Sequence, residues 1–219
     1  MKTILRNYYF LIFVILVVGL FGKLASAAEQ ARPLLNGIEP LSKRIVTFAG
    51  VPSPTKLDYH FREMVAPTEE TKKMWKDISP DQDPLSLVKK VNAWVYAHVE
   101  FKDDPLANVD TGERVDIWSN INETLKKGEG DCEDSVIAKY QMLKSLGFSE
   151  NNMYFLIGNS IVGTKVSHAF LMVRVNDQSY ILDNGRPEVF TDVQMIYVAL
   201  FPMFAYSHQN SWVFGILKQ

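Results

Sequence analysis

A glycine-flanked segment around the only cysteine of the chain combines residue types that suit nucleophilic chemistry. It reads Gly128-Glu129-Gly130-Asp131-Cys132-Glu133-Asp134-Ser135 and runs directly into a helical pattern that ends near Leu146-Gly147. The N-terminus of a helix carries a partial positive charge and unpaired N–H groups, which favour a thiolate over a thiol. Cys132 is therefore a candidate nucleophile. The alternative is a small buried apolar residue, the commoner role of a lone cysteine.

A cysteine nucleophile needs a base within hydrogen-bond reach and a third group that orients this base. His168 begins a strand-like segment, and Asp183 ends the segment that follows it. If the turn between them is centred on Asp177, positions near 171 and 183 pair. Whether the two side chains share a face depends on the register of this hairpin, because side chains alternate between faces. The sequence permits the contact between His168 and Asp183 without fixing it.

Three carboxylates surround the thiol, at Asp131, Glu133 and Asp134, and like charges oppose thiolate formation. One explanation is helix chemistry, with Asp131 as the N-cap and the other two favourable in the first turn. The alternative is a hard cation that takes carboxylate and carbonyl oxygens and offsets the repulsion. Zinc is disfavoured, because one cysteine and four scattered histidines offer no ligand pair at the usual spacing.

Helical patterns precede this segment and strand patterns follow it. Asp83-Pro84 opens a helix whose apolar positions recur at three- and four-residue steps up to Val99, and His98 lies on this stripe as an expected core histidine. A polar loop is expected over 101–115. Beyond Gly147 the period changes to two, with strands expected over 153–157, 167–175, 179–183 and 212–217. Helices followed by an antiparallel sheet predict a single α+β domain.

The N-terminus has the features of an export signal. Lys2 and Arg6 precede an uncharged apolar run over 8–22, and Ala25-Ser26-Ala27 supplies a small-residue cleavage pattern. The run is shorter than the roughly 20 residues that span a membrane, although Lys23 is atypical for a cleaved signal and leaves an uncleaved anchor as the alternative. We expect a signal peptide over 1–27, an N-terminal arm over 28–57 and one domain over 58–219.

The composition argues against a nucleic-acid-binding protein and against a structural disulfide. Lys and Arg total 23 against 25 Asp and Glu, and three of the basic residues lie within residues 1–27. A mildly acidic exported protein without basic runs is a poor candidate for nucleic-acid binding. A single cysteine cannot form an intramolecular disulfide in an oxidising compartment, so Cys132 is a free thiol.

Three elements in order, Gly130-Asp131-Cys132-Glu133-Asp134, Ser167-His168-Ala169 and Leu182-Asp183-Asn184, resemble the bacterial transglutaminase-like cysteine proteases, specifically the periplasmic LapG type. The resemblance implies a papain-like, transglutaminase-like core with a Cys132–His168–Asp183 triad. It also implies calcium dependence, with Asp131 and Glu133 as the best calcium ligands and Asp116 as a weaker third. The backbone N–H of Cys132 is the natural first oxyanion donor.

By the same resemblance, the substrate would be the N-terminal region of a large adhesin tethered to the outer membrane. Its cleavage would release the adhesin and promote biofilm dispersal. An inner-membrane cyclic-di-GMP receptor of the LapD type would be the inhibitory partner. Two alternatives stay open: a transglutaminase or amidase that uses the same triad, and a non-catalytic binding module on this fold.

Overall fold

A computed structural model describes residues 64–80, 83–160, 167–192, 194, 200–208 and 211–213. The expected signal peptide and N-terminal arm lie outside the described residues, as does the end of the expected closing strand. No described helix has the length and apolarity needed to span a membrane.

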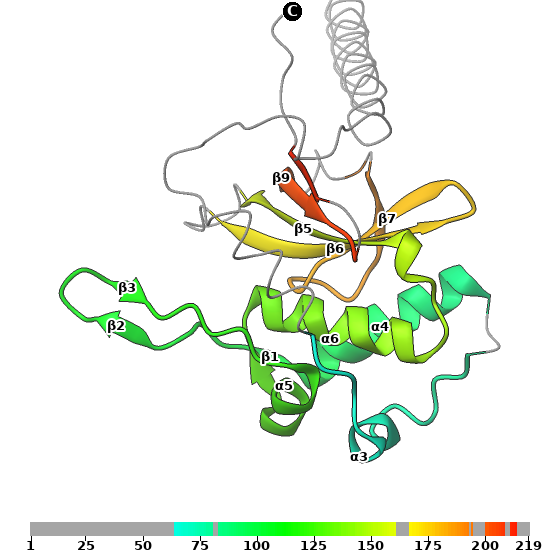
Figure 1. Cartoon of the computed structure of the whole chain (residues 1–219), viewed down its shortest axis with the longest axis horizontal. Helices are drawn as coiled ribbons and strands as arrows, with labels where there is room; N and C mark the ends of the chain where they lie inside the picture. The colour runs from blue at the N-terminus through cyan, green and yellow to red at the C-terminus, as the bar shows by residue number, and fades with distance from the viewer. Residues whose placement is uncertain are drawn as a thin grey trace, which may run out of the picture. The chain divides into compact units, whose positions relative to one another are not determined.

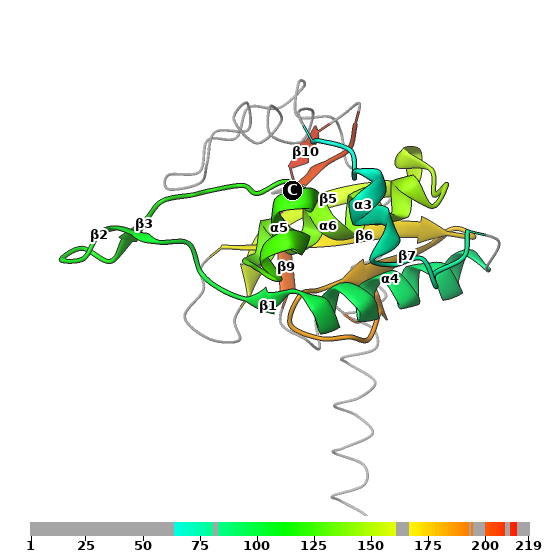
Figure 2. The same ribbon diagram turned by 90° about the horizontal axis from the view of Figure 1, so that it is seen from below.

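A six-stranded antiparallel sheet forms one layer, and helices α4, α5 and α6 lie on one of its faces (Figure 1, Figure 2). The strand order is β10-β9-β5-β6-β7-β8. The bounds of these strands are β5 Met153–Ser160, β6 His168–Val175, β7 Gln178–Leu182, β8 Phe190–Thr191, β9 Leu200–Tyr206 and β10 Ser211–Val213. The expected α+β architecture is confirmed.

The helices begin and end at residues that the sequence marks. Asp83 caps α4 by accepting a hydrogen bond from the Ser86 N–H, and Asn120 forms a capping box with Glu123 at the start of α5. Gly147 follows α6 in the left-handed conformation expected after a helix. The helices span α3 Glu69–Lys73, α4 Pro84–His98, α5 Ile121–Lys127 and α6 Cys132–Ser145, and a short 3₁₀ helix, η2, spans Glu150–Asn152.

Helix α6 is the centre of the core. Every residue from Cys132 to Leu143 is buried, because α6 packs on α4, α5 and strand β6 at once. The core joins residues such as Val91 of α4, Met142 of α6 and Leu171 of β6. The catalytic candidates Cys132 and His168 thus lie at the starts of two elements, α6 and β6, that pack directly on each other.

Two local expectations are wrong. The expected core histidine His98 is exposed, because it lies in the last turn of α4, where its ring stacks on Trp94 at 4.0 Å between centroids. The expected polar loop over 101–115 contains a projecting hairpin of β2 Leu106–Asn108 and β3 Glu113–Arg114 (Figure 1). Its local turn is polar, so its sequence carries little strand signal.

Candidate active site

The turn of backbone ahead of Cys132, residues 128–131, places the thiol at the first residue of α6. Gly128 ends α5 in the left-handed conformation, with φ of 68°. Strand β4, Glu129–Gly130, then pairs in parallel with β1, Glu100–Phe101. Cys132 follows, with only 8% of its surface exposed. The thiol therefore sits at the positive end of a fourteen-residue helix and inside the protein.

Asp134 holds this turn of backbone against the segment before α5. Its Oδ1 accepts a hydrogen bond of 2.7 Å from the Ser119 N–H, and an added Cβ at Gly130 would lie 2.8 Å from the Cβ of Asp134. Burial raises the pKa of Asp134 to about 7. The charges of Asp131 and Asp104 also raise this pKa, whereas the hydrogen bond from Ser119 lowers it. Asp134 has a structural role that the helix explanation did not include.

The hairpin between the second and third catalytic candidates turns on two residues. Asn176 and Asp177 both have positive φ, 49° and 63°, and Val175 pairs directly with Gln178. The turn is therefore centred between Asn176 and Asp177, half a position earlier than a turn centred on Asp177. This change moves every cross-strand partner by one residue.

The observed register puts His168 and Asp183 on the same face of the sheet. Leu171 pairs with Leu182, so the position opposite His168 is that of Gly185. Asp183 is two residues from that position and therefore faces the same side as His168, as a diagonal neighbour. A turn centred on Asp177 would have placed the two side chains on opposite faces.

His168 Nε2 and Asp183 Oδ1 lie 2.7 Å apart, and both residues are buried. Burial alone would raise the pKa of Asp183. The hydrogen bond from His168 and the positive charges of His168 and Lys139 outweigh it and hold this pKa below its usual value. Arg186 Nε lies 3.5 Å from Asp183 Oδ2. The pair is a buried imidazole oriented by an ionised carboxylate, as a base for nucleophilic catalysis requires.

Cys132 and His168 begin two elements that pack on each other, α6 and β6. Because Nε2 of His168 is engaged by Asp183, Nδ1 is the nitrogen that can exchange a proton with a nucleophile. The Cys132 thiol donates to Glu133 Oε2 at 3.2 Å. In this arrangement the thiol proton is directed at Glu133.

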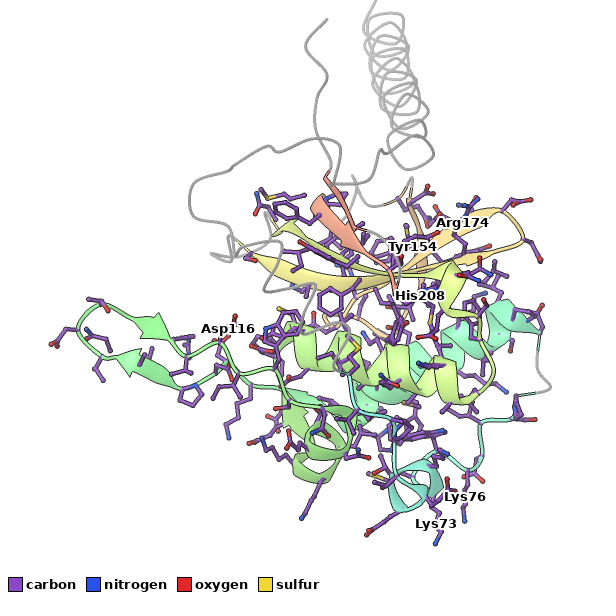
Figure 3. The ribbon with its side chains drawn as sticks, in the orientation of Figure 1. Lys73, Lys76, Asp116, Tyr154, Arg174 and His208 are labelled. Atoms are coloured by element: carbon purple, nitrogen blue, oxygen red, sulfur yellow. The ribbon has the colours of Figure 1, made fainter. Side chains whose placement is uncertain are left out.

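A second group of acidic residues lies beside the thiol. Carboxylate oxygens of Asp104, Asp116 and Glu133 lie within 4.8 Å of one another. Asp104 and Asp116 come from the two arms of the projecting hairpin, and Figure 3 shows Asp116 where this hairpin joins the helical layer. Burial raises the pKa of Glu133 to about 9, and the charge and hydrogen bond of Asp131 add to this effect. Three such oxygens form the kind of donor set that Ca²⁺ prefers, and a cation here would offset the clustered negative charge.

The sequence-predicted metal ligands are brought together only in part. Glu133 and Asp116 lie in the three-carboxylate group. Asp131 is outside this group and raises the pKa of Glu133 through its charge and a hydrogen bond. Asp131 occupies the N-cap position of α6, as the helix explanation has it, but its side chain forms no capping hydrogen bond. Sequence reasoning missed Asp104. Its signal in the sequence was the pair of carboxylates Asp103-Asp104 ahead of Pro105. In the structure the Ile117 N–H donates to Asp104 Oδ2 and so holds Asp104 next to Asp116.

Trp118 connects the acidic group to the core. Its indole stacks on Phe155 with centroids 5.3 Å apart, and its Nε1 donates to Asp116 Oδ1 at 2.9 Å. The side chain is partly buried against the hydrophobic core. Trp118 thereby fixes the position of one carboxylate of the acidic group.

Comparison with solved structures shows a similar fold in LapG of Legionella pneumophila. The chain is similar to calcium-bound LapG of Legionella pneumophila, with a TM-score of 0.55 and 21% sequence identity, over 73% of this chain and 84% of that chain. It is also similar to the EGTA-treated form of the same protein, with a TM-score of 0.54 and 21% identity, over 75% and 87% of the two chains.

Comparison with curated proteins gives no match. The model of a family described as bacterial transglutaminase-like cysteine proteinase matches residues 54–214, which is most of the chain and includes all three catalytic candidates. The expected family and enzyme class are thereby confirmed: the chain belongs to the bacterial transglutaminase-like cysteine proteinases, and it is a cysteine protease of this type.

Proposed function

We propose that this protease is a calcium-dependent periplasmic endopeptidase that cuts the N-terminal region of a large surface adhesin and so releases the adhesin from the outer membrane. The observation that carries the assignment as a cysteine endopeptidase is the buried 2.7 Å contact between His168 and Asp183. His168 lies on strand β6, which packs against the helix that Cys132 begins. Adhesin release would promote biofilm dispersal.

In the proposed reaction, Cys132 Sγ attacks the scissile carbonyl carbon while His168 Nδ1 takes the thiol proton. The tetrahedral oxyanion is stabilised by the backbone N–H of Cys132 at the start of α6. Collapse breaks the C–N bond, and His168 returns the proton to the leaving amine. Water then hydrolyses the thioester with His168 as the base, and Asp183 holds the imidazole in one tautomer throughout.

Asp104, Asp116 and Glu133 are the residues that would hold the calcium ion, with Asp131 next to them. A bound Ca²⁺ would supply positive charge beside the thiol and would tie both arms of the hairpin to the start of α6. Glu133 would then direct its oxygens to the ion and would hold the Cys132 thiol proton less strongly. One of the similar structures is calcium-bound LapG and another is EGTA-treated LapG, which supports this choice of metal.

The proposed location rests on the export features of residues 1–27, and the proposed partner rests on the resemblance to LapG-type proteases. Residues 1–27 would export the chain to the periplasm, where an inner-membrane cyclic-di-GMP receptor of the LapD type would sequester it. Cell fractionation tests the location, and binding to the periplasmic domain of such a receptor tests the partner. Recovery of the protease in the cytoplasm would contradict both.

The central experiment incubates the mature protease with a purified N-terminal adhesin fragment and maps new termini by mass spectrometry. Wild type is expected to cut the fragment at one position, and Cys132→Ala and His168→Ala are expected to leave it intact. His98→Ala is the matched control, because His98 is an exposed histidine on α4 and should leave cleavage unchanged. EGTA should stop cleavage, and added Ca²⁺ should restore it.

Cleavage that persists in Cys132→Ala would overturn the catalytic assignment, and full activity in EGTA would overturn calcium dependence. Transfer of an amine to a glutamine side chain, in place of new peptide termini, would identify a transglutaminase instead. These outcomes separate the enzyme classes that share this triad.

A further inference from the structure

Lys139 is a buried lysine that the proposed reaction does not use. It is 0% exposed, and its Nζ has no hydrogen-bond partner among the described residues. Lysine is almost never fully buried unless it is paired, because the desolvation of an ammonium group is costly. The fold therefore retains Lys139 at a cost in stability that an apolar residue of the same length would avoid.

The location of Lys139 connects it to the candidate triad. It lies seven residues after Cys132 on α6, two helical turns away and thus on nearly the same side of the helix. Helix α6 packs on β6, which carries His168. Asp183 is the charged group that acts on the Lys139 ammonium, and Lys139 in turn is one of the charges that stabilise the ionised Asp183.

The segment after Asp183 is fixed by a second buried polar residue. Asn92 of α4, also 0% exposed, directs Nδ2 at the carbonyl oxygens of Arg186, Pro187 and Glu188, at 3.2, 2.9 and 3.3 Å. Asp183 itself receives His168 on Oδ1 and has Arg186 beside Oδ2. His168 and Arg186 thus orient the Asp183 carboxylate and favour its ionised form, and the charge of Lys139 favours the same form from inside the core.

We propose that Lys139 is a positioning residue for catalysis: its buried positive charge stabilises Asp183 as an oriented carboxylate and thereby keeps His168 in the tautomer that serves Cys132. This inference rests on the triad of the proposed function. Burial lowers the pKa of Lys139 to about 7, and the charge of Asp183 opposes this change, so the ammonium and the carboxylate favour each other's charged state.

A purely structural lysine and a positioning lysine predict different results for Lys139→Met. Methionine keeps the length of the side chain and removes its charge, so it should pack without loss and leave the melting temperature unchanged or higher. A positioning role predicts that kcat falls by about tenfold or more while KM stays the same. Lys139→Arg, which restores a positive charge, should recover part of this loss.

A second readout is independent of the adhesin substrate. The rate at which iodoacetamide alkylates Cys132 near neutral pH reports the thiolate held by His168. Lys139→Met and Asp183→Asn should each slow alkylation, and the double variant should be no slower than Asp183→Asn, because Lys139 acts through Asp183. Lys144→Met is the matched control, since Lys144 lies on the same helix but is half exposed and paired with Glu150.

Failure of the proposed substrate would leave the alkylation assay intact, so the two proposals can fail separately. Alkylation and kcat within twofold of wild type in a folded Lys139→Met protein would overturn the inference. Additive losses in the double variant would also overturn it. If the chain folds with none of Met, Gln or Arg at position 139, the lysine serves the fold, and the positioning role is wrong.

Discussion

Gly130 and Asp134 approach each other so closely that any side chain at position 130 would overlap Asp134 unless one of the two moves. An added Cβ would lie 2.8 Å from Asp134 Cβ and 2.9 Å from its Oδ2. The Asp134 carboxylate cannot yield freely, because its Oδ1 accepts the hydrogen bond from the Ser119 N–H. The contact fixes the backbone one residue before the N-cap of the cysteine helix.

Gly130→Ala is therefore expected to displace Asp134 and the start of α6. We expect a loss of about 1–3 kcal/mol in the free energy of unfolding, the usual cost of overpacking, measured by urea denaturation. Gly112→Asn is the control, since nothing lies within 4 Å of a Cβ at Gly112 and asparagine tolerates its left-handed backbone. Equal stability of wild type and Gly130→Ala would contradict the close contact.

Removal of one carboxylate from the acidic group should weaken calcium binding. Asp104→Asn keeps the shape of the side chain and removes a charged ligand, so we expect the Kd for Ca²⁺ to rise by about tenfold or more in calorimetry. Asp103→Asn is the matched control, because Asp103 is the neighbouring residue and pairs with Arg114 at 3.3 Å outside the group. Equal affinities of wild type and Asp104→Asn would exclude Asp104 as a ligand.

The same measurement separates Asp104 from Asp131, which the family resemblance implies as a ligand. Asp131 is outside the three-carboxylate group but raises the pKa of Glu133 by its charge and hydrogen bond. Asp131→Asn should therefore change calcium affinity less than Asp104→Asn. The reverse order would restore the ligand set that was expected from the motif alone.

Local signals in the sequence identify most of the elements of this site. Capping at Asp83, the cysteine helix and the strands on either side of the 176–178 turn all follow from periodicity and turn chemistry. The shared face of His168 and Asp183 does not follow from these signals. A shift of one residue in the register would put the two side chains on opposite faces, and the sequence fits a turn centred on Asp177 as well as one centred between Asn176 and Asp177. Asp104 was missed for a related reason: it joins Asp116 only once the polar segment between them folds into a hairpin.

The turn that sets this register offers a test at Asp177. Its φ of 63° is a conformation that L-residues other than asparagine and aspartate rarely adopt. Asp177→Gly should raise the free energy of unfolding by up to about 1 kcal/mol, because Asn-Gly is the preferred pair for this turn. Asp177→Ala removes the same carboxylate, which lies 3.9 Å from Arg174, and should instead lower stability. Equal effects of the two substitutions would show that the ion pair, and not the backbone, determines the stability of the turn.

The free energy of unfolding should decrease at acidic pH because Asp183 becomes protonated. Its pKa is lower in the folded protein than the ordinary value of 3.8, so the folded state binds fewer protons than the unfolded state near that value. The contribution of the carboxylate is therefore present above pH 4 and is lost as the pH falls through the folded pKa. Asp183→Asn should be less stable than wild type by about 1–3 kcal/mol at pH 7, because it weakens a charge-assisted hydrogen bond.

The difference between wild type and Asp183→Asn should shrink as urea denaturation is repeated at pH 5, 4 and 3. Asp103→Asn serves as the comparison, because its half-exposed ion pair with Arg114 is screened by solvent and should contribute little at any pH. A difference between wild type and Asp183→Asn that stays constant down to pH 3 would show that packing of the side chain, and not its ionised hydrogen bond to His168, accounts for the stability. The pH dependence thus tests whether the 2.7 Å contact is made by a carboxylate, which is the form that the proposed triad requires.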